Sequence, residues 1–133
     1  MQHAKANGIR ILIVEDEPTI CEVCLRTLTV EGFDVDISVN GEAAKAMLPK
    51  KEYDLCLIDI RTPLMNGKEL YHHIEEKYPR LVNGVIFTTA DILDGELEYF
   101  LSQSKRLYMP KPFAPDELRA IVKRAVKRLA KVT

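Results

Sequence analysis

The sequence predicts an α/β protein built on a doubly wound, five-stranded parallel sheet with five helices. Short apolar runs rich in β-branched residues alternate with longer segments whose apolar residues recur every three or four positions. Glycine and proline separate these segments and predict where each element ends. With 133 residues, the chain is long enough for one domain with a hydrophobic core of its own.

The first part of the chain contains two strand and helix pairs. Residues 9–14 (IRILIV) are a short β-branched run, as expected for a strand buried on both faces. A helix is expected from Pro18, which suits a first helical turn, and Gly32 stops it. The alternating residues 33–39 predict a strand with one polar face, and residues 41–48 predict a short helix.

The middle of the chain carries the most apolar strand. Residues 54–59 (DLCLID) are expected to form this third strand, and residues 67–78 a helix that Pro79 stops. Residues 84–90 (GVIFTTA) predict a fourth strand. Because helices separate the consecutive strands, the strands are expected to run parallel.

The last part contains a weaker helix at 93–101 and a short strand at 106–109 (RLYM). The final helix is expected at 114–132, with Pro115 and two acids in its first turn and bases in its last. Its further basic residues are expected to form a solvated face.

Polar residues gather at the predicted carboxyl ends of four strands, the edge at which doubly wound sheets bind ligands. A single acid at a strand end is often only a helix cap. Capping alone does not explain three carboxylates, two hydroxyls and an ammonium at one edge. The residues are Glu15, Asp16, Asp59, Thr88, Thr89 and Lys111.

Asp59 follows an apolar run directly, so its carboxylate needs a chemical reason. Clustered carboxylates repel one another unless a cation joins them, and hard oxygen ligands favour Mg²⁺. A lysine and a hydroxyl beside such a metal could hold the remaining oxygens of a phosphoryl group. We therefore predict that Asp59 is a nucleophile that forms an aspartyl phosphate.

Four motifs, VEDEP, LIDIRTPLMNG, VIFTTAD and YMPKPF, resemble in order and spacing the receiver domain of two-component response regulators. The resemblance covers nearly the whole chain. It implies a flavodoxin-like sheet with strand order 2-1-3-4-5. It also implies an N-terminal tail at 1–8 and a receiver domain at 9–133.

The resemblance implies how a phosphoryl group and a metal are held. Asp59 would accept the phosphoryl group from a sensor histidine kinase or a histidine phosphotransfer protein. Mg²⁺ would be bound by Asp16, Asp59 and the backbone carbonyl of Arg61, with Glu15 acting through water. The family often has Asp-Asp where this chain has Glu15-Asp16, and Glu also suits metal-bound water.

The resemblance also implies a switch, with the hydroxyl of Thr89 closing on the phosphate and Lys111 as the family's invariant lysine. Tyr108 would rotate when the hydroxyl moves, changing the surface of the fourth helix, fifth strand and fifth helix. In the family, the positions of Arg61 and Asp91 tune the lifetime of the phosphorylated state. These two opposite charges are expected either to pair or to cover the phosphate site.

Two enzyme hypotheses are less consistent with the sequence. A phosphatase of the haloacid-dehalogenase type needs a second Asp two residues after the nucleophile, where this chain has Arg61. A CxxC redox protein would use Cys21 and Cys24, but their spacing on an apolar stripe favours packing. The chain is therefore expected to be no enzyme beyond catalysing its own phosphorylation and dephosphorylation.

The composition limits the kinds of partner that are expected. Lys and Arg number 19 against 20 for Asp and Glu, so no direct nucleic-acid or membrane binding is expected. No apolar run approaches a membrane span, and three cysteines suit a reducing compartment, so a cytoplasmic location is predicted. The downstream partner stays open. The chain could be a single-domain regulator or a receiver from a larger protein.

Overall fold

The computed structural model describes residues 8–91 and 93–132, so most of the expected N-terminal tail lies outside the described residues. The five strands form one parallel sheet in the order β2-β1-β3-β4-β5, which confirms the predicted topology. The strands are β1 (Arg10–Val14), β2 (Asp34–Ser38), β3 (Leu55–Asp59), β4 (Val85–Thr89) and β5 (Leu107–Pro110).

The prediction of five helices was wrong in number, because the described residues form six α-helices and one 3₁₀ helix. Pro79 does not only end the preceding helix. It also begins a helix of one turn, since proline suits a first helical position. The helices are α1 (Pro18–Val30), α2 (Gly41–Met47), η1 (Leu48–Lys50), α3 (Gly67–Lys77), α4 (Pro79–Val82), α5 (Gly95–Ser104) and α6 (Pro115–Val132).

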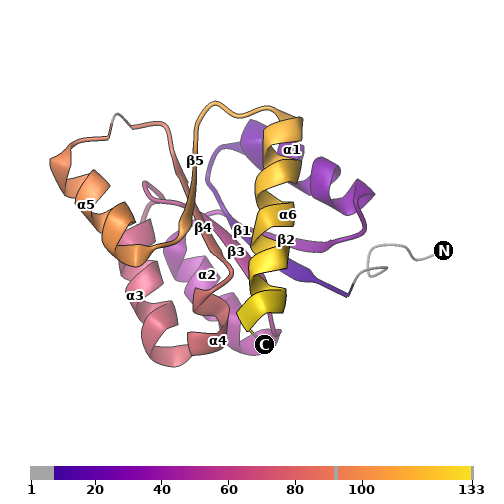
Figure 1. Ribbon diagram of the computed structural model, residues 1–133, viewed down its shortest axis with the longest axis horizontal. Coiled ribbons are helices and arrows are strands. Elements are labelled where there is room, and N and C mark those ends of the chain that lie inside the picture. Colours follow the sequence, from indigo (N-terminus) through magenta and orange to yellow (C-terminus); the bar gives the residue numbers. More distant parts are fainter. Residues whose placement is uncertain (1–7, 92, 133) are drawn as a thin grey trace.

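The sheet lies between two layers of helices (Figure 1). Alternate residues of the central strands point to opposite faces, so each strand supplies both layers. Ile11 and Ile13 of β1 pack with α1 and α6, whereas Leu12 and Val14 pack on the side of α2 and α3. β3 is therefore buried over its whole length, which explains its continuous apolar run.

β2 is an edge strand, which explains its alternating sequence. The Asp36 carboxylate accepts hydrogen bonds from Lys51 Nζ at 2.9 Å and from the Tyr53 hydroxyl at 2.6 Å. These contacts connect the edge strand to the segment that precedes β3.

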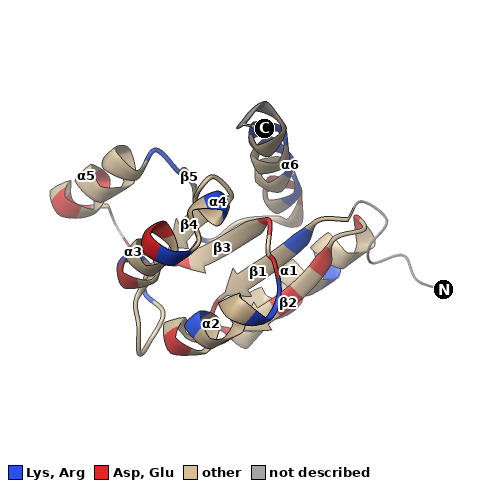
Figure 2. Cartoon of the chain, turned by 90° about the horizontal axis from the view of Figure 1, so that it is seen from below, with Lys and Arg blue, Asp and Glu red and all other residues tan. Residues whose placement is uncertain are grey.

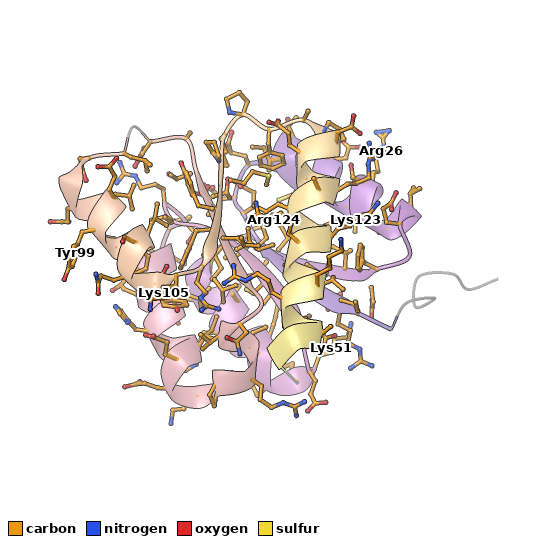
Figure 3. All side chains as sticks on the ribbon, viewed as in Figure 1. Arg26, Lys51, Tyr99, Lys105, Lys123 and Arg124 are labelled. Atoms are coloured by element: carbon orange, nitrogen blue, oxygen red, sulfur yellow. The ribbon has the colours of Figure 1, made fainter. Side chains whose placement is uncertain are left out.

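The charged surface differs between helices. Basic residues recur along α6, and acidic residues lie in the first turn of α5 (Figure 2). Lys123 and Arg124 are exposed on α6, as expected for a solvated face (Figure 3).

Gly41, at the start of α2, touches the loop that follows β3. Its backbone N–H donates to the carbonyl of Pro63 at 3.3 Å. A Cβ at this position would lie 1.8 Å from the carbonyl oxygen of Met65, so only glycine fits without moving backbone. The packing of α2 thereby helps to position the loop beside Asp59.

Candidate functional site

The predicted strand-end residues meet at the carboxyl edge of the sheet. Asp59 is the last residue of β3, and its side chain is only 6% exposed. Glu15 follows β1 directly and is also buried. Since neighbouring strands are parallel and in register, the apolar runs that end at these residues place both carboxylates on one edge.

Lys111 connects these acids. Its Nζ lies 2.8 Å from Asp59 Oδ2, 3.0 Å from Glu15 Oε2 and 2.8 Å from Glu17 Oε1. The side chain of Lys111 is 4% exposed, so the ammonium is held inside the site. One cation therefore balances three carboxylates, and the cluster keeps an excess of negative charge.

Burial changes the acidity of this cluster. Burial raises the pKa of the Glu15 carboxyl to about 7, and the charge of Asp59 adds to this, while the hydrogen bond from Lys111 opposes it. Burial lowers the pKa of Lys111, but hydrogen bonds to Asp59, Glu17 and Glu15 outweigh this and raise it. Lys111 therefore stays charged at neutral pH.

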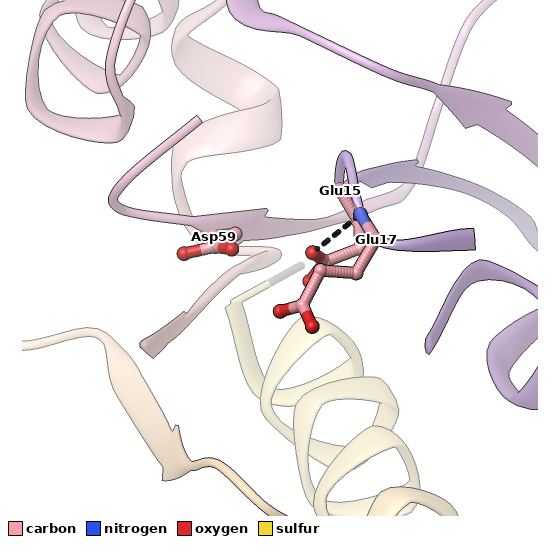
Figure 4. Close-up of side chains that lie close together, drawn as sticks. All are labelled: Glu15, Glu17 and Asp59. Carbon is pink, nitrogen blue, oxygen red and sulfur yellow. Dashed lines mark hydrogen bonds between the residues drawn. The ribbon is translucent and has the colours of Figure 1, made fainter. Parts of the chain in front are cut away.

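Glu15, Glu17 and Asp59 offer oxygen atoms that lie within 4.8 Å of one another, a set that could hold a metal ion (Figure 4). Asp16 is exposed and is not in this set. The backbone N–H of Arg61 donates to Asp59 Oδ1 at 3.0 Å, which places the start of the following loop beside the acceptor carboxylate.

Glu17 was missed in the sequence reasoning. It occupies the N-cap position of α1, yet its side chain makes no capping hydrogen bond there. Its carboxylate contacts Lys111 instead, and its backbone N–H donates to Glu15 Oε2 at 3.1 Å. The third acid of the VEDEP motif was the available signal, but a cap was the simpler interpretation.

Thr89 and Tyr108 lie on neighbouring strands at the same edge. Thr89 is buried at the end of β4, and its Oγ1 accepts a hydrogen bond from the Asp91 N–H at 3.2 Å. Tyr108 packs against the core on the side of α2 and α3. Burial raises the pKa of the Tyr108 hydroxyl, and the charge of Asp91 adds to this.

Arg61 and Asp91 form an ion pair, which is one of the two arrangements expected from the sequence. Their side chains are 70% and 37% exposed, so solvent screens the pair. A second pair, Lys68 Nζ to Glu96 Oε1 at 3.7 Å, joins α3 to α5 nearby. All four residues line a cavity of about 300 Å³.

The cysteines do not form an activated redox pair. Burial raises the pKa of the Cys21 thiol and raises that of Cys24 to about 12. A reactive thiol needs a lowered pKa instead. Cys24 belongs to the core between the sheet and the helices α1 and α6, in agreement with a packing role, while Cys21 is half-buried.

Among the described residues, no helix combines the length and apolarity needed to cross a membrane.

Comparisons with known proteins identify the family of this chain. Residues 11–123 match the response regulator receiver domain family. The transcriptional regulatory protein TcrA of Mycobacterium tuberculosis is 32% identical over 124 residues, which cover 93% of this chain and 48% of TcrA. The aerobic respiration control sensor protein ArcB of Escherichia coli is 32% identical over 118 residues, 88% of this chain and 15% of ArcB.

A solved structure is also similar. The response regulator receiver domain protein (CheY-like) from Methanospirillum hungatei JF-1 superimposes with a TM-score of 0.85 at 27% identity, covering 94% of this chain and 98% of that chain. In contrast, this chain spans about half the length of TcrA (48%) and a smaller share of ArcB.

Proposed function

Because the chain belongs to the family of response regulator receiver domains, which are signalling domains of two-component systems, we propose that Asp59 is the phosphoryl acceptor of this chain. The observation that carries this proposal is the contact between a buried strand-end carboxylate and a buried ammonium, with Lys111 Nζ 2.8 Å from Asp59 Oδ2. Such an ammonium can stabilise negative charge that develops on a transferred phosphoryl group.

The proposed donor is a phosphohistidine of a sensor histidine kinase or of a histidine phosphotransfer protein. A carboxylate oxygen of Asp59 attacks the phosphorus, the bond from phosphorus to the imidazole nitrogen breaks, and its electron pair stays on the nitrogen. Lys111 holds the transferred oxygens, and the Arg61 N–H keeps Asp59 oriented through Oδ1. Catalysis by the chain would be limited to its own phosphorylation and dephosphorylation.

The donor atoms present fit Mg²⁺, because they are carboxylate oxygens with excess negative charge. We propose Asp16, Asp59 and the backbone carbonyl of Arg61 as its ligands, with Glu15 acting through water. Asp16 would have to turn inward, since its side chain is exposed. When bound, Mg²⁺ neutralises charge on the phosphoryl oxygens.

The proposed output is a change of the surface formed by α5, β5 and α6, which correspond to the expected fourth helix, fifth strand and fifth helix. Among the described residues, Thr89 Oγ1 accepts one hydrogen bond, from the Asp91 N–H, so it can turn towards a phosphoryl group on Asp59 at small cost. Tyr108, on the neighbouring strand, would then move inward. A bound group shifts a population only through contacts that differ between two states, and Thr89 and Lys111 would supply those contacts.

The test is labelling of the intact protein with acetyl phosphate and Mg²⁺, followed by mass spectrometry. One alkali-labile phosphate is expected on the wild type and none on Asp59→Asn, which keeps the shape but removes the nucleophile. Asp116→Asn, at an exposed position on α6, is the matched control and should label normally. Stoichiometric labelling of Asp59→Asn would show that the acceptor is another residue.

The dependence of the output partner on the whole protein, and the location of the protein, are also proposals. TcrA is a transcriptional regulatory protein and ArcB a sensor protein, so both regulators and sensors contain segments like this chain. The output partner therefore depends on the protein in which the domain acts. A cytoplasmic location is proposed, supported by the free Cys21, Cys24 and Cys56.

A further inference from the structure

Thr88 has an unpaired hydroxyl in the interior. The residue is 2% exposed, and its Oγ1 is buried without a hydrogen-bond partner. Within the described part of the chain, one other buried side-chain oxygen shares this state, Asp34 Oδ2. That oxygen lies 3.8 Å from Arg10 Nε and 3.6 Å from Lys51 Nζ, so its charge is compensated. The hydroxyl of Thr88 has no such compensation.

Thr88 lies beside the proposed phosphoryl acceptor. In the register of β3 and β4, Asp59 is the partner of Thr88. Leu57 and Ile86, two residues earlier on each strand, both belong to the core cluster under α1 and α6. Because side chains alternate along strands, Asp59 and Thr88 point to this same face, on strands about 4.8 Å apart.

A buried hydroxyl without a partner is destabilising, and a valine of the same shape would avoid that cost. A threonine here therefore suggests a partner in another state of the site. The Asp59 carboxylate is the reactive group opposite Thr88 in the register of β3 and β4. In the unphosphorylated state, Lys111 and the Arg61 N–H already contact the two oxygens of this carboxylate. Transfer of a phosphoryl group to Asp59 changes what those oxygens can accept.

We propose that Thr88 Oγ1 donates a hydrogen bond to Asp59 as the phosphoryl group leaves, so that Thr88 promotes dephosphorylation. This inference rests on the proposed function. In hydrolysis, water attacks the phosphorus, the bond from phosphorus to the Asp59 oxygen breaks, and its electron pair stays on that oxygen. Phosphate departs as dihydrogen phosphate with both protons of the water. The oxygen gains negative charge in this step, and a donor stabilises that charge.

The two directions of phosphoryl transfer should respond differently. During phosphorylation the carboxylate of Asp59 loses negative charge, so a donor to it does not help the attack. Removing the hydroxyl should therefore lengthen the phosphorylated lifetime without slowing the uptake of phosphate. A merely structural role would alter both rates together or neither.

The experiment compares Thr88→Val, which keeps the shape, with Thr88→Ser, which keeps the hydroxyl. Each protein is labelled with acetyl phosphate and Mg²⁺, the donor is removed, and the remaining phosphoprotein is followed over time. We expect roughly a three- to tenfold longer lifetime for Thr88→Val, the range given by the loss of one hydrogen bond. We expect a near wild-type lifetime for Thr88→Ser, and initial labelling no slower than wild type for both.

The outcomes separate the two proposals. Urea unfolding should show Thr88→Val at least as stable as wild type, because a methyl group replaces an unpaired hydroxyl. Equal lifetimes of wild type and Thr88→Val, or equal lengthening in Thr88→Ser, would overturn the role of the hydroxyl while labelling stays normal. Failure of the wild type to take up phosphate, or labelling of Asp59→Asn, would instead overturn the proposed function and this inference with it.

Discussion

At the scale of the residue, Lys111 determines the charge balance of the site. Its ammonium is shared by Asp59, Glu15 and Glu17 at 2.8 to 3.0 Å. Isolated charges are rarely buried because desolvation is costly. Here the ammonium offsets that cost for the buried carboxylates, and the carboxylates offset it for the ammonium. The same sharing leaves the cluster negative, which suits a divalent cation and a phosphoryl group together.

The ion pair of Arg61 and Asp91 leads to a prediction about the duration of the signal. Arg61→Ala is expected to shorten the lifetime of the phosphorylated state severalfold at most, because an exposed pair is worth about 0 to 1 kcal/mol and the lost side chain also uncovers the site. Phosphate release after removal of the donor measures this. The yield with excess donor should change little.

The control for this prediction is Arg80→Ala, an exposed arginine of α4 on another part of the molecule, which should not alter the lifetime. An unchanged or longer lifetime in Arg61→Ala would show that this side chain does not limit the approach of water.

At the scale of the element, the loop after β3 depends on its neighbours for its position. It begins at the acceptor Asp59, contacts the first residue of α2 and ends at the capping box of α3. In that box, Asn66 accepts a hydrogen bond from the Glu69 N–H, and Glu69 accepts one from the Asn66 N–H. The contact with α2 therefore holds the middle of the loop, and the capping box holds its C-terminal end.

Gly41→Ala is expected to destabilise the protein by about 1 to 3 kcal/mol, because its Cβ would lie 1.8 Å from the Met65 carbonyl oxygen. The displaced loop should also slow labelling of Asp59. Urea unfolding and labelling with acetyl phosphate measure the two effects. Gly95→Ala, at the start of α5 with nothing within 4 Å of a new Cβ, is the control and should lose no stability. If the two variants behave alike, the contact between α2 and the loop does not position the site.

The contacts of Asp36 predict a pH-dependent contribution of β2. Burial raises the pKa of Asp36, but hydrogen bonds from Tyr53 and Lys51 outweigh this and lower it below the ordinary value of 3.8. A lowered pKa in the folded state stabilises the protein above the unfolded pKa, and this stability is lost as the pH falls through the folded pKa. Asp36→Asn is therefore expected to be less stable than wild type at pH 7, with a difference that shrinks below pH 3.8.

Urea midpoints measured from pH 7 to pH 2.5 check this dependence. Glu52→Gln, at an exposed position near the same strand, should show no comparable change. A difference between Asp36→Asn and wild type that stays constant with pH would mean that packing, rather than the charge, is lost.

At the scale of the whole molecule, the site and the proposed output surface meet through β4 and β5. Thr89 ends β4, and Tyr108 and Lys111 belong to β5 or follow it. α5 contributes one fully buried residue, Leu97, while Phe100 and Leu101 pack against the core only partly buried. We therefore expect a change at Asp59 to reach α5 and β5 without unfolding the sheet.

Thr89→Ala is expected to accept phosphate from acetyl phosphate with Mg²⁺ but to lose most of the change at Tyr108 and α6. The acceptor and Lys111 are intact in this variant, whereas the hydroxyl that should close on the phosphate is absent. Amide exchange or chemical-shift maps of both phosphorylation states measure the response. Thr89→Ser, which keeps the hydroxyl, is the control. The full wild-type response in Thr89→Ala would contradict this mechanism.

The sequence by itself determined the parallel sheet, its strand order through the family resemblance, and the edge at which Glu15, Asp59, Thr89 and Lys111 meet. The parallel sheet and the edge follow from hydrophobic periodicity and from the rule that parallel strands end at one edge, and both depend on local sequence. The same rule predicted neither the exposure of Asp16 nor the helix that begins at Pro79.

Only the tertiary structure decided which side chains turn towards one another. Glu17 contacts Lys111 instead of capping α1, Arg61 pairs with Asp91, and Thr88 is buried beside Asp59 without a partner. The residues of each pair come from different elements, so the contact exists only after the elements have packed. Side-chain direction depends on the competition among neighbouring charges and on the space that packing leaves, and neither is a property of a local sequence pattern.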